Sequence, residues 1–320
     1  GKPALGVGAG NSPAYIERTA DVEKAVRNIM ASKTFDNGTI CASEQSIVCE
    51  ECNEARVIEE FKKQGGYFMT KEETDKVCRL LFKNGHAMNA KFVGRSPQVI
   101  ASAAGISIPE GTRVLIGRQN GVGEGNPLSF EKLTTVLGFY TVKDWHEACE
   151  LSIALLQNGI GHTMSLYTED RDIVMKFAKK PASRILVNTG GTQGGTGAST
   201  GLNPSFTLGC GTWGGSSVSE NVTPEHLVNI KRVAYGIKDC AALAANTPAT
   251  NCAKTTEGYL GAQNSFMNMS PAQIAAAAAA LTKANDCAKN TNACASNEGL
   301  KNDEIADLVN QIVAAIKGAN

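Results

Sequence analysis

The sequence lacks a surplus of charge and lacks long apolar runs. Its 31 basic and 31 acidic side chains cancel, so the formal net charge at pH 7 is zero. Nucleic acids and anionic membranes attract basic surfaces, so this balance argues against either partner. No apolar run approaches the ~18 residues that span a bilayer, and the alanine tract at 275–280 is too short to do so. With 320 residues, 42% of them hydrophobic, the chain can still build a sizeable core in one or two domains.

The cysteine pattern of a disulfide framework or of a complete zinc site is also missing. The chain has 10 cysteines at irregular spacings and no signal peptide, which indicates a reducing cytosol and not a disulfide framework. Cys49 and Cys52 have C-x2-C spacing, but no second cysteine or histidine pair follows at zinc-site distance, so we expect no metal. The chain opens at Gly1 without Met and runs directly into an expected strand. We therefore expect it to be the later part of a longer protein.

A glycine-punctuated turn over 34–45 presents Cys41. The pattern predicts a helix from the cap Thr19-Ala20-Asp21 to about Ser32 before this turn, and a strand over 46–49 after it. A thiol held between two such elements is accessible while its backbone stays fixed, and its own N–H can donate to an oxyanion. The alternative is a small core hydrophobe, the usual role of a lone cytosolic cysteine.

Phe35-Asp36-Asn37-Gly38-Thr39-Ile40-Cys41 resembles the nucleophile motif Phe-x-x-Gly-x-x-Cys of the aldehyde dehydrogenase superfamily. The stretches 159–163 (Gly-Ile-Gly-His-Thr) and 207–221, around Trp213, resemble its CoA-acylating branch, and the resemblance covers residues 1 to about 240. It implies that Cys41 is the nucleophile and that His162 takes a proton from the thiol of CoA or from Cys41, since a histidine titrates near neutrality. A structural histidine at a strand start is the alternative. The resemblance also implies a substrate and CoA lining made by Thr39, Ile40, Thr189, Gly190 and Gly191.

Cofactor contacts are predicted in two places, one from the resemblance and one from the glycine pattern. Glu131, in the stretch 127–139, matches the glutamate that holds the nicotinamide-side ribose of NAD; a helix-start glutamate is the alternative, and NADP is not excluded. Gly8 and Gly10 lie in a glycine-rich stretch that could approach a phosphate, although close backbone packing is the stronger interpretation. The deacylating glutamate of hydrolytic family members would fall at Val7, where no carboxylate is present. Without this glutamate to activate water, we expect CoA, and not water, to release the acyl group.

The expected fold is α/β and aldehyde dehydrogenase-like, with the end of a Rossmann-type cofactor domain, an α/β catalytic domain and a helical C-terminal tail. The segments are 1–20 for the cofactor domain, 21–205 for the catalytic domain, 206–240 for a return segment with an oligomerisation strand, 241–300 for a linker with an alanine-rich helix, and 301–320 for a last helix. Further expectations are strands at 4–9, 112–117, from His162, 184–188 and 228–235, helices in 53–90 (two), 99–104 and 142–157, and an irregular loop at 189–197.

The last helix carries an apolar stripe at i, i+3, i+4, i+7, i+8 and i+11 from Ile305 to Ile316. It resembles the encapsulation peptides that tether enzymes to the shell or core proteins of bacterial microcompartments. Docking onto its own body or helix–helix oligomerisation are the alternatives.

Together the resemblances imply oxidation of acetaldehyde or propionaldehyde to its acyl-CoA with NAD, through a thioester on Cys41. The partners implied are the aldehyde, CoA, further copies of the chain in a homo-oligomer and microcompartment proteins, in the bacterial cytoplasm or a microcompartment lumen. A hydrolytic aldehyde dehydrogenase and a non-catalytic scaffold or cargo remnant are the alternatives.

Overall fold

The computed structural model describes residues 4–239 and residue 241. By compactness the chain divides into a first unit, Gly1–Ile230, and a second unit, Lys231–Asn320. The first unit contains every helix and strand described below. Residues 231–239 of the second unit form no helix or strand. The predicted alanine-rich helix of the linker and the predicted last helix at 301–320 lie outside the described residues.

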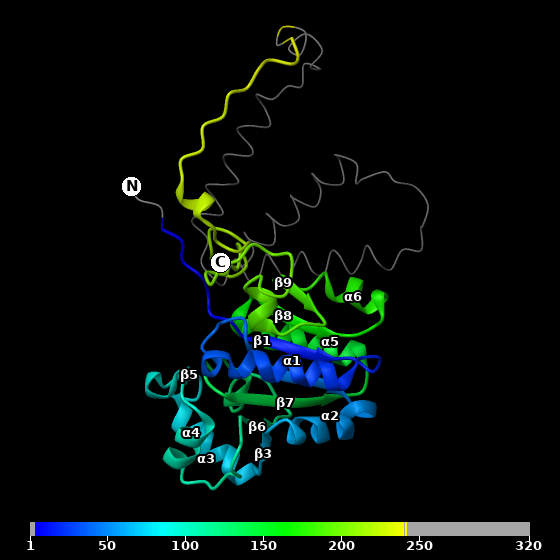
Figure 1. The fold of residues 1–320 in the computed structure, drawn as a ribbon, viewed down its shortest axis with the longest axis vertical. Coiled ribbons are helices and arrows are strands. Elements are labelled where there is room, and N and C mark those ends of the chain that lie inside the picture. Colours follow the sequence, from blue (N-terminus) through cyan, green and yellow to red (C-terminus); the bar gives the residue numbers. More distant parts are fainter. Residues whose placement is uncertain (1–3, 240, 242–320) are drawn as a thin grey trace, which may run out of the picture. The chain divides into compact units, whose positions relative to one another are not determined.

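The first unit is built on one seven-stranded sheet in the order β3-β6-β7-β2-β1-β8-β9, with all recorded pairings parallel. Figure 1 shows β3 and β9 at opposite ends of the sheet. The strands are β1 (Ser12–Ile16), β2 (Glu44–Glu50), β3 (Gly66–Met69), β6 (Val114–Arg118), β7 (Val136–Val142), β8 (Gly161–Tyr167) and β9 (Ala182–Val187). A separate two-stranded hairpin joins β4 (Phe82–Lys83) to β5 (Ala87–Met88). The predicted α/β class is confirmed.

Helices cover both faces of the sheet (Figure 1). They are α1 (Val22–Thr34), α2 (Glu51–Lys63), α3 (Lys71–Leu81), α4 (Pro97–Ala104), α5 (Trp145–Leu156), α6 (Arg171–Phe177) and α7 (Gly191–Gly195). Successive strand residues point to opposite faces, so Ile47 packs in one core with α1 and α2, and Val48 in another with α5 and α6. A third core holds α3 and α4 against β6 and β7. Strands buried on both faces explain the continuous apolar runs in the sequence.

Several local expectations need correction. The predicted strand at 4–9 is irregular, and the strand lies instead at β1, a central position between β2 and β8. Between the two predicted helices of 53–90 the chain inserts β3, which pairs with β6. The segment 189–197 is not irregular throughout, because it contains α7. Residues 228–235 form no strand in the single chain, so a strand there that pairs with a neighbouring subunit stays a prediction.

In the part of the chain that the structure describes, no helix is both long enough and apolar enough to span a membrane.

Candidate active site

The predicted site residues come from separate segments that meet at one edge of the sheet. Cys41 lies just before β2, Glu131 lies shortly before β7, and His162 is the second residue of β8. Because β7, β2, β1 and β8 are neighbouring parallel strands, their amino ends share one edge. The topology therefore places all three side chains at the same edge.

The turn that presents Cys41 is fixed by backbone geometry. After α1, the 3-10 turn Phe35–Gly38 holds Asp36 and Asn37 at φ 45° and 48°, in the left-handed region that asparagine and aspartate tolerate. The Ser43 N–H then donates to the Ile40 carbonyl at 2.9 Å and closes the turn around Cys41. Cys41 is consequently held by a short, strained connection between α1 and β2.

Thr39 and Ile40 are half-buried in this turn, next to Cys41 in the sequence. The Thr39 hydroxyl donates to the Asp36 carbonyl oxygen at 3.1 Å, and to the Asp36 carboxylate at 2.5 Å. The hydroxyl therefore braces the turn itself. Contact of Thr39 or Ile40 with substrate stays a prediction.

The glycine-rich stretch packs against the nucleophile. A Cβ added to Gly10 would lie 2.0 Å from the Cys41 carbonyl oxygen, so only glycine fits there. A Cβ on Gly8 would lie 2.9 Å from the Gly214 carbonyl oxygen and 3.7 Å from Cys210 Sγ. Close backbone packing is thus present at both glycines, and their role in cofactor binding stays a prediction.

Glu131 is joined to this packing. Its Oε1 accepts the Gly10 N–H at 2.8 Å, and burial raises the pKa of the carboxyl group. Glu131 follows the 3-10 turn Pro127–Ser129 and does not begin a helix, so the helix-start alternative is wrong. Its second oxygen makes no hydrogen bond recorded among the described residues. A half-buried carboxylate with one uncommitted oxygen beside the nucleophile fits the hydroxyl groups of a nicotinamide-side ribose.

Burial sets the acidity of the thiol. It raises the pKa of Cys41 to about 11, with a further increase from the Glu131 carboxylate and from Cys210, while the Arg184 guanidinium acts in the opposite direction. An ordinary thiol titrates near ~8.5. At neutral pH the Cys41 side chain is therefore protonated, and Arg184 is the cation that favours its ionisation.

His162 is fully buried. Its Nδ1 lies 2.9 Å from the Thr163 hydroxyl, and its Nε2 has no hydrogen-bond partner among the described residues. Burial, reinforced by the Arg184 cation, lowers the pKa of His162 to about 4. The expectation of a pKa near neutrality is wrong for the chain alone, because burial and the Arg184 cation both disfavour the charged imidazole. A buried nitrogen without a partner fits a polar atom of a ligand, such as the thiol of CoA.

The predicted lining loop reaches the nucleophile turn at one end only. A Cβ on Gly191 would lie 2.2 Å from the Ala42 carbonyl oxygen, so Gly191 contacts the residue after Cys41. Gly190 packs instead against α1, where a Cβ would lie 2.7 Å from the Asn28 carbonyl oxygen. The Thr189 carbonyl accepts a hydrogen bond from the Tyr167 hydroxyl at 2.9 Å. A substrate-lining role for the three residues stays a prediction.

Sequence reasoning missed a set of buried polar residues around the site. Their shared property is a charged or amide side chain that is fully or almost fully buried: Lys33, Glu44, Gln45, Lys132 and Arg184. Arg184 directly precedes the apolar residues of an expected strand, which was the available signal, whereas Lys33 lies between Ser32 and Thr34, just past the expected helix. Nothing in the periodicity distinguishes such residues from snorkelling surface cations.

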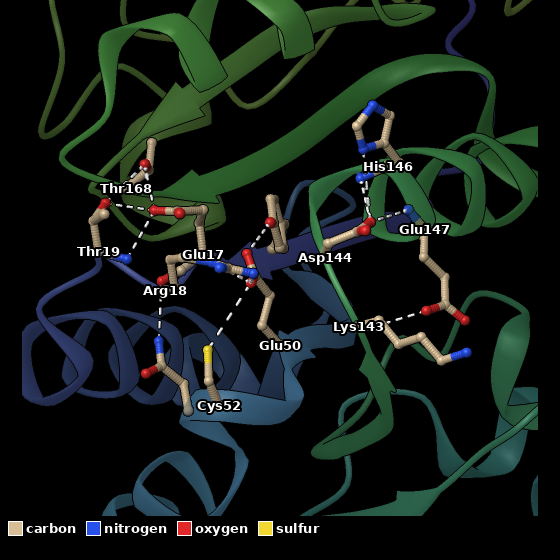
Figure 2. Close-up of polar contacts among 12 residues, drawn as sticks. Glu17, Arg18, Thr19, Glu50, Cys52, Lys143, Asp144, His146, Glu147 and Thr168 are labelled. Atoms are coloured by element: carbon tan, nitrogen blue, oxygen red, sulfur yellow. Dashed lines mark hydrogen bonds and ion pairs between the residues drawn. The ribbon is translucent and has the colours of Figure 1, made fainter.

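A second cluster of polar side chains lies at the opposite edge of the sheet (Figure 2). Glu50, the last residue of β2, accepts hydrogen bonds from the Tyr15 hydroxyl and from Arg18 Nε, both at 2.6 Å. The Glu17 carboxylate accepts from the Thr168 hydroxyl at 2.9 Å. Because these carboxylates are satisfied within the fold, we assign this cluster a structural role.

An open cavity of about 890 Å³ lies near the carboxyl ends of β3 and β6 and not at Cys41. Two of its lining cations, Lys71 and Arg118, are paired with Asp75 and Glu54. Among the described residues, no group of three histidine, cysteine or acidic side chains could hold a metal ion.

Comparison with known proteins identifies the lineage. The chain matches no family model. It is 47% identical over 241 residues to the bifunctional aldehyde-alcohol dehydrogenase AdhE of Escherichia coli K12, covering 73% of this chain and 27% of that protein. It is similar to the structure of an acetylating aldehyde dehydrogenase from Geobacillus thermoglucosidasius, with 49% identity and a TM-score of 0.72, covering 75% of this chain and 53% of that one. A Rhodopseudomonas palustris propionaldehyde dehydrogenase, solved with bound CoA and an acylated cysteine, matches at 26% identity and a TM-score of 0.59, covering 65% of this chain and 47% of that one.

The chain thus spans about a quarter of the length of the E. coli relative and about half of the length of the two structures. The match nevertheless takes in about three quarters of this chain and agrees in fold as well as in sequence. With the nucleophile motif on a fixed turn of the parallel sheet, this agreement shows that the chain belongs to the family of CoA-acylating aldehyde dehydrogenases.

Proposed function

We propose that this protein oxidises a short-chain aldehyde, acetaldehyde or propionaldehyde, to its acyl-CoA. The balanced reaction is aldehyde + CoA-SH + NAD⁺ → acyl-CoA + NADH + H⁺, with NADP as the other possible acceptor. The observation that carries the proposal is the position of Cys41 on a rigid turn. The Cys41 carbonyl packs against Gly10, and the Gly10 N–H donates a hydrogen bond to Glu131. The proposal draws its support from family membership together with this geometry.

In the first step the Cys41 sulfur adds to the aldehyde carbonyl as its proton leaves. The Cys41 N–H donates to no backbone carbonyl recorded among the described residues, so it can donate to the oxyanion that forms. Bound NAD(P) supplies the hydride acceptor, and Glu131 would hold its nicotinamide-side ribose. Loss of the hydride converts the thiohemiacetal on Cys41 into a thioester.

In the second step the thiol of CoA attacks the thioester, and the Cys41 thiolate leaves and regains a proton. His162 is neutral at pH 7, and its unpartnered Nε2 can accept a hydrogen bond from the CoA thiol and orient it. Val7 is an apolar residue at the position that matches the water-activating glutamate of hydrolytic relatives. The missing base favours CoA over water as the acyl acceptor.

Three further segments would contact the substrates, other copies of the chain and microcompartment proteins. Thr39, Ile40, Thr189, Gly190 and Gly191 would line the path of the aldehyde and CoA. Residues 206–240 would pair with further copies of the chain in a homo-oligomer. Residues 301–320 would bind shell or core proteins of a microcompartment, and this binding would hold the enzyme in the lumen of that compartment within a bacterial cytoplasm.

The test is NADH absorbance with acetaldehyde and with propionaldehyde, with and without CoA. It is run on the 320-residue chain and on its reading frame extended upstream. A rate that requires CoA supports the proposal, whereas a CoA-indifferent rate that yields free acid would establish a hydrolytic enzyme. No rate in either protein would favour a non-catalytic scaffold.

Two variants assign the roles. Cys41→Ala should abolish both directions of the reaction, since it removes the sulfur on which the proposed thioester forms. His162→Ala should slow acyl transfer to CoA more than NADH formation, measured as the pre-steady-state burst of NADH against the steady rate. A wild-type rate in Cys41→Ala would refute the mechanism.

A further inference from the structure

The Cys41 turn is part of a closed ring of contacts, and most of the residues in this ring have no role in the proposed reaction. The ring passes from the Cys41 turn through the Gln45 side chain to the segment of Glu131 and Lys132. It returns to Cys41 through Gly10.

Gln45 forms the first half of the ring. Its Nε2 donates to the Ser43 carbonyl at 3.1 Å, within the turn that presents Cys41. Its Oε1 accepts the Lys132 N–H at 2.8 Å. One buried amide therefore links the nucleophile turn to the residue that follows Glu131.

Gly10 forms the second half. Its N–H donates to Glu131 Oε1 at 2.8 Å, and its α-carbon packs against the Cys41 carbonyl so closely that a Cβ would lie 2.0 Å from that oxygen. Movement of Glu131 would thus be transmitted to Cys41, and movement of the turn to Glu131.

Lys33 braces the ring from α1. It is fully buried, and its Nζ donates to the Lys132 carbonyl at 3.1 Å and to Gln45 Oε1 at 3.4 Å. The ionisable groups that influence it are Glu44 and Glu131, and Lys132 lies close enough for the two ammonium charges to repel. Burial lowers the pKa of Lys33 to about 7. A buried amine is costly to desolvate. The hydrogen bonds that the Lys33 ammonium donates go to atoms of the ring and not to a surface carboxylate.

We propose that Gln45 and Lys33 are positioning residues that hold the Cys41 turn and the Glu131 carboxylate in one fixed arrangement. Neither side chain touches the reacting atoms. They act through the backbone of the turn and of the 131–132 segment, as supporting side chains do in other preorganised sites. That the arrangement serves catalysis rests on the proposed function, whereas the arrangement itself can be tested without cofactor.

The test measures alkylation of Cys41 by iodoacetamide between pH 6 and pH 11, followed on the Cys41 peptide by mass spectrometry. Gln45→Met keeps the length of the side chain and removes its hydrogen bonds. Opening the ring exposes the thiol and releases Glu131, so the apparent pKa of Cys41 should fall and alkylation at pH 8 should become at least fivefold faster. Lys33→Met should give a smaller change in the same direction. Gln119→Met, the same substitution at the opposite edge of the sheet, should match wild type.

A conservative variant separates positioning from simple packing. Gln45→Glu keeps the size of the side chain and an acceptor oxygen for the Lys132 N–H, but its carboxylate cannot donate to the Ser43 carbonyl. The ring is therefore opened at the turn without a loss of packing volume, and the alkylation profile should resemble that of Gln45→Met and not that of wild type. The proposal is overturned if folded Gln45→Met and Lys33→Met both alkylate within twofold of wild type at every pH. If Gln45→Met does not fold, Lys33→Met decides, because replacing a buried lysine by methionine leaves no unpaired cation and is compatible with folding.

An activity measurement keeps the two proposals distinct. In a protein active with CoA, Gln45→Met should raise the KM for NAD at least threefold with a smaller change in kcat. Altered alkylation in a chain that oxidises no aldehyde would support the ring and refute the proposed function. An active enzyme whose Gln45→Met variant shows unaltered alkylation and an unchanged KM for NAD would support the proposed function and refute the ring.

Discussion

At the residue scale, the Cys41 thiol and the His162 imidazole are both in their uncharged forms at neutral pH. Burial raises the pKa of Cys41 to about 11 and lowers the pKa of His162 to about 4. Both shifts have the same origin, since burial disfavours whichever form carries charge. The Arg184 cation opposes the first shift and reinforces the second, so it favours both the thiolate form of Cys41 and the neutral form of His162.

The raised pKa of Cys41 predicts how fast the thiol reacts at different pH. Only the thiolate is alkylated, so the rate at Cys41 should increase about tenfold per pH unit from pH 7 to about pH 10. Iodoacetamide labelling of the Cys41 peptide measures this rate, with Cys41→Ser as the blank. A rate that levels off below pH 9 would contradict the burial argument.

The lowered pKa of His162 predicts a contribution to stability. Between pH 6.5 and pH 4 the unfolded chain binds a proton at this residue and the folded chain does not, so the free energy of unfolding falls as the pH is lowered. Over this range the effect amounts to about 3 kcal/mol at most. His162→Gln removes the titration, so its stability relative to wild type should rise from pH 7 to pH 4 in urea unfolding. A constant difference would show that the imidazole is not buried in the uncharged form.

At the element scale, the turn between α1 and β2 is held by two other segments, the stretch before β1 and the start of α7. Gly10 contacts the Cys41 carbonyl and Gly191 the Ala42 carbonyl, so two separate segments pack on the nucleophile turn. Neither contact leaves room for a Cβ. The turn is therefore held by tertiary packing as well as by its own hydrogen bonds.

This packing predicts a large effect from one methyl group. Gly10→Ala must displace the Cys41 carbonyl and should lower the free energy of unfolding by about 1–3 kcal/mol, as overpacking does. It should also reduce the oxidation of aldehyde. Gly6→Ala is the matched control, because a Cβ there meets nothing within 4 Å. Urea unfolding of the two variants measures the difference, and equal stability would refute the close contact.

At the scale of the whole molecule, the parallel sheet separates two polar edges. The amino edge of β7, β2, β1 and β8 carries Cys41, Glu131 and His162, and the carboxyl edge carries the satisfied cluster around Glu50 and Glu17 (Figure 2). Order along the sheet, β7-β2-β1-β8, brings together residues that are more than a hundred positions apart in the chain.

Targeting belongs to this scale as well. Deleting residues 300–320 should free the protein from a microcompartment without lowering its activity, because the apolar stripe would bind a partner and not the site. Fluorescent-protein fusions in a compartment-forming bacterium report the location, and NADH formation reports the activity. Leu308→Glu, within the stripe, should act like the deletion, and Asn310→Glu, outside it, should not. Lost activity with unchanged targeting would contradict the assignment.

The sequence predicted the elements around Cys41 well, because their signals are local. Asp21 caps α1 as expected, with its side chain accepting the Lys24 N–H at 3.1 Å, and β2 follows the turn. It failed where tertiary contacts override propensity. The glycine-rich segment 191–195 becomes helical against α1 and the turn, and the Gly194 N–H donates to the Gly190 carbonyl at 2.8 Å. The strand β1 forms from Ser12–Ile16 because two partner strands flank it.

By itself the sequence determined the α/β class, the thiol on a turn between a helix and a strand, and the family, because each depends on residue order and periodicity. Only the tertiary structure decided that Glu131 joins Cys41 through Gly10, that His162 is buried in its neutral form, and that Lys33 and Gln45 lie beneath the turn. The physical reason is that burial and hydrogen bonding between distant segments are properties of the folded sheet. Those properties set the pKa values and distances on which the chemistry depends.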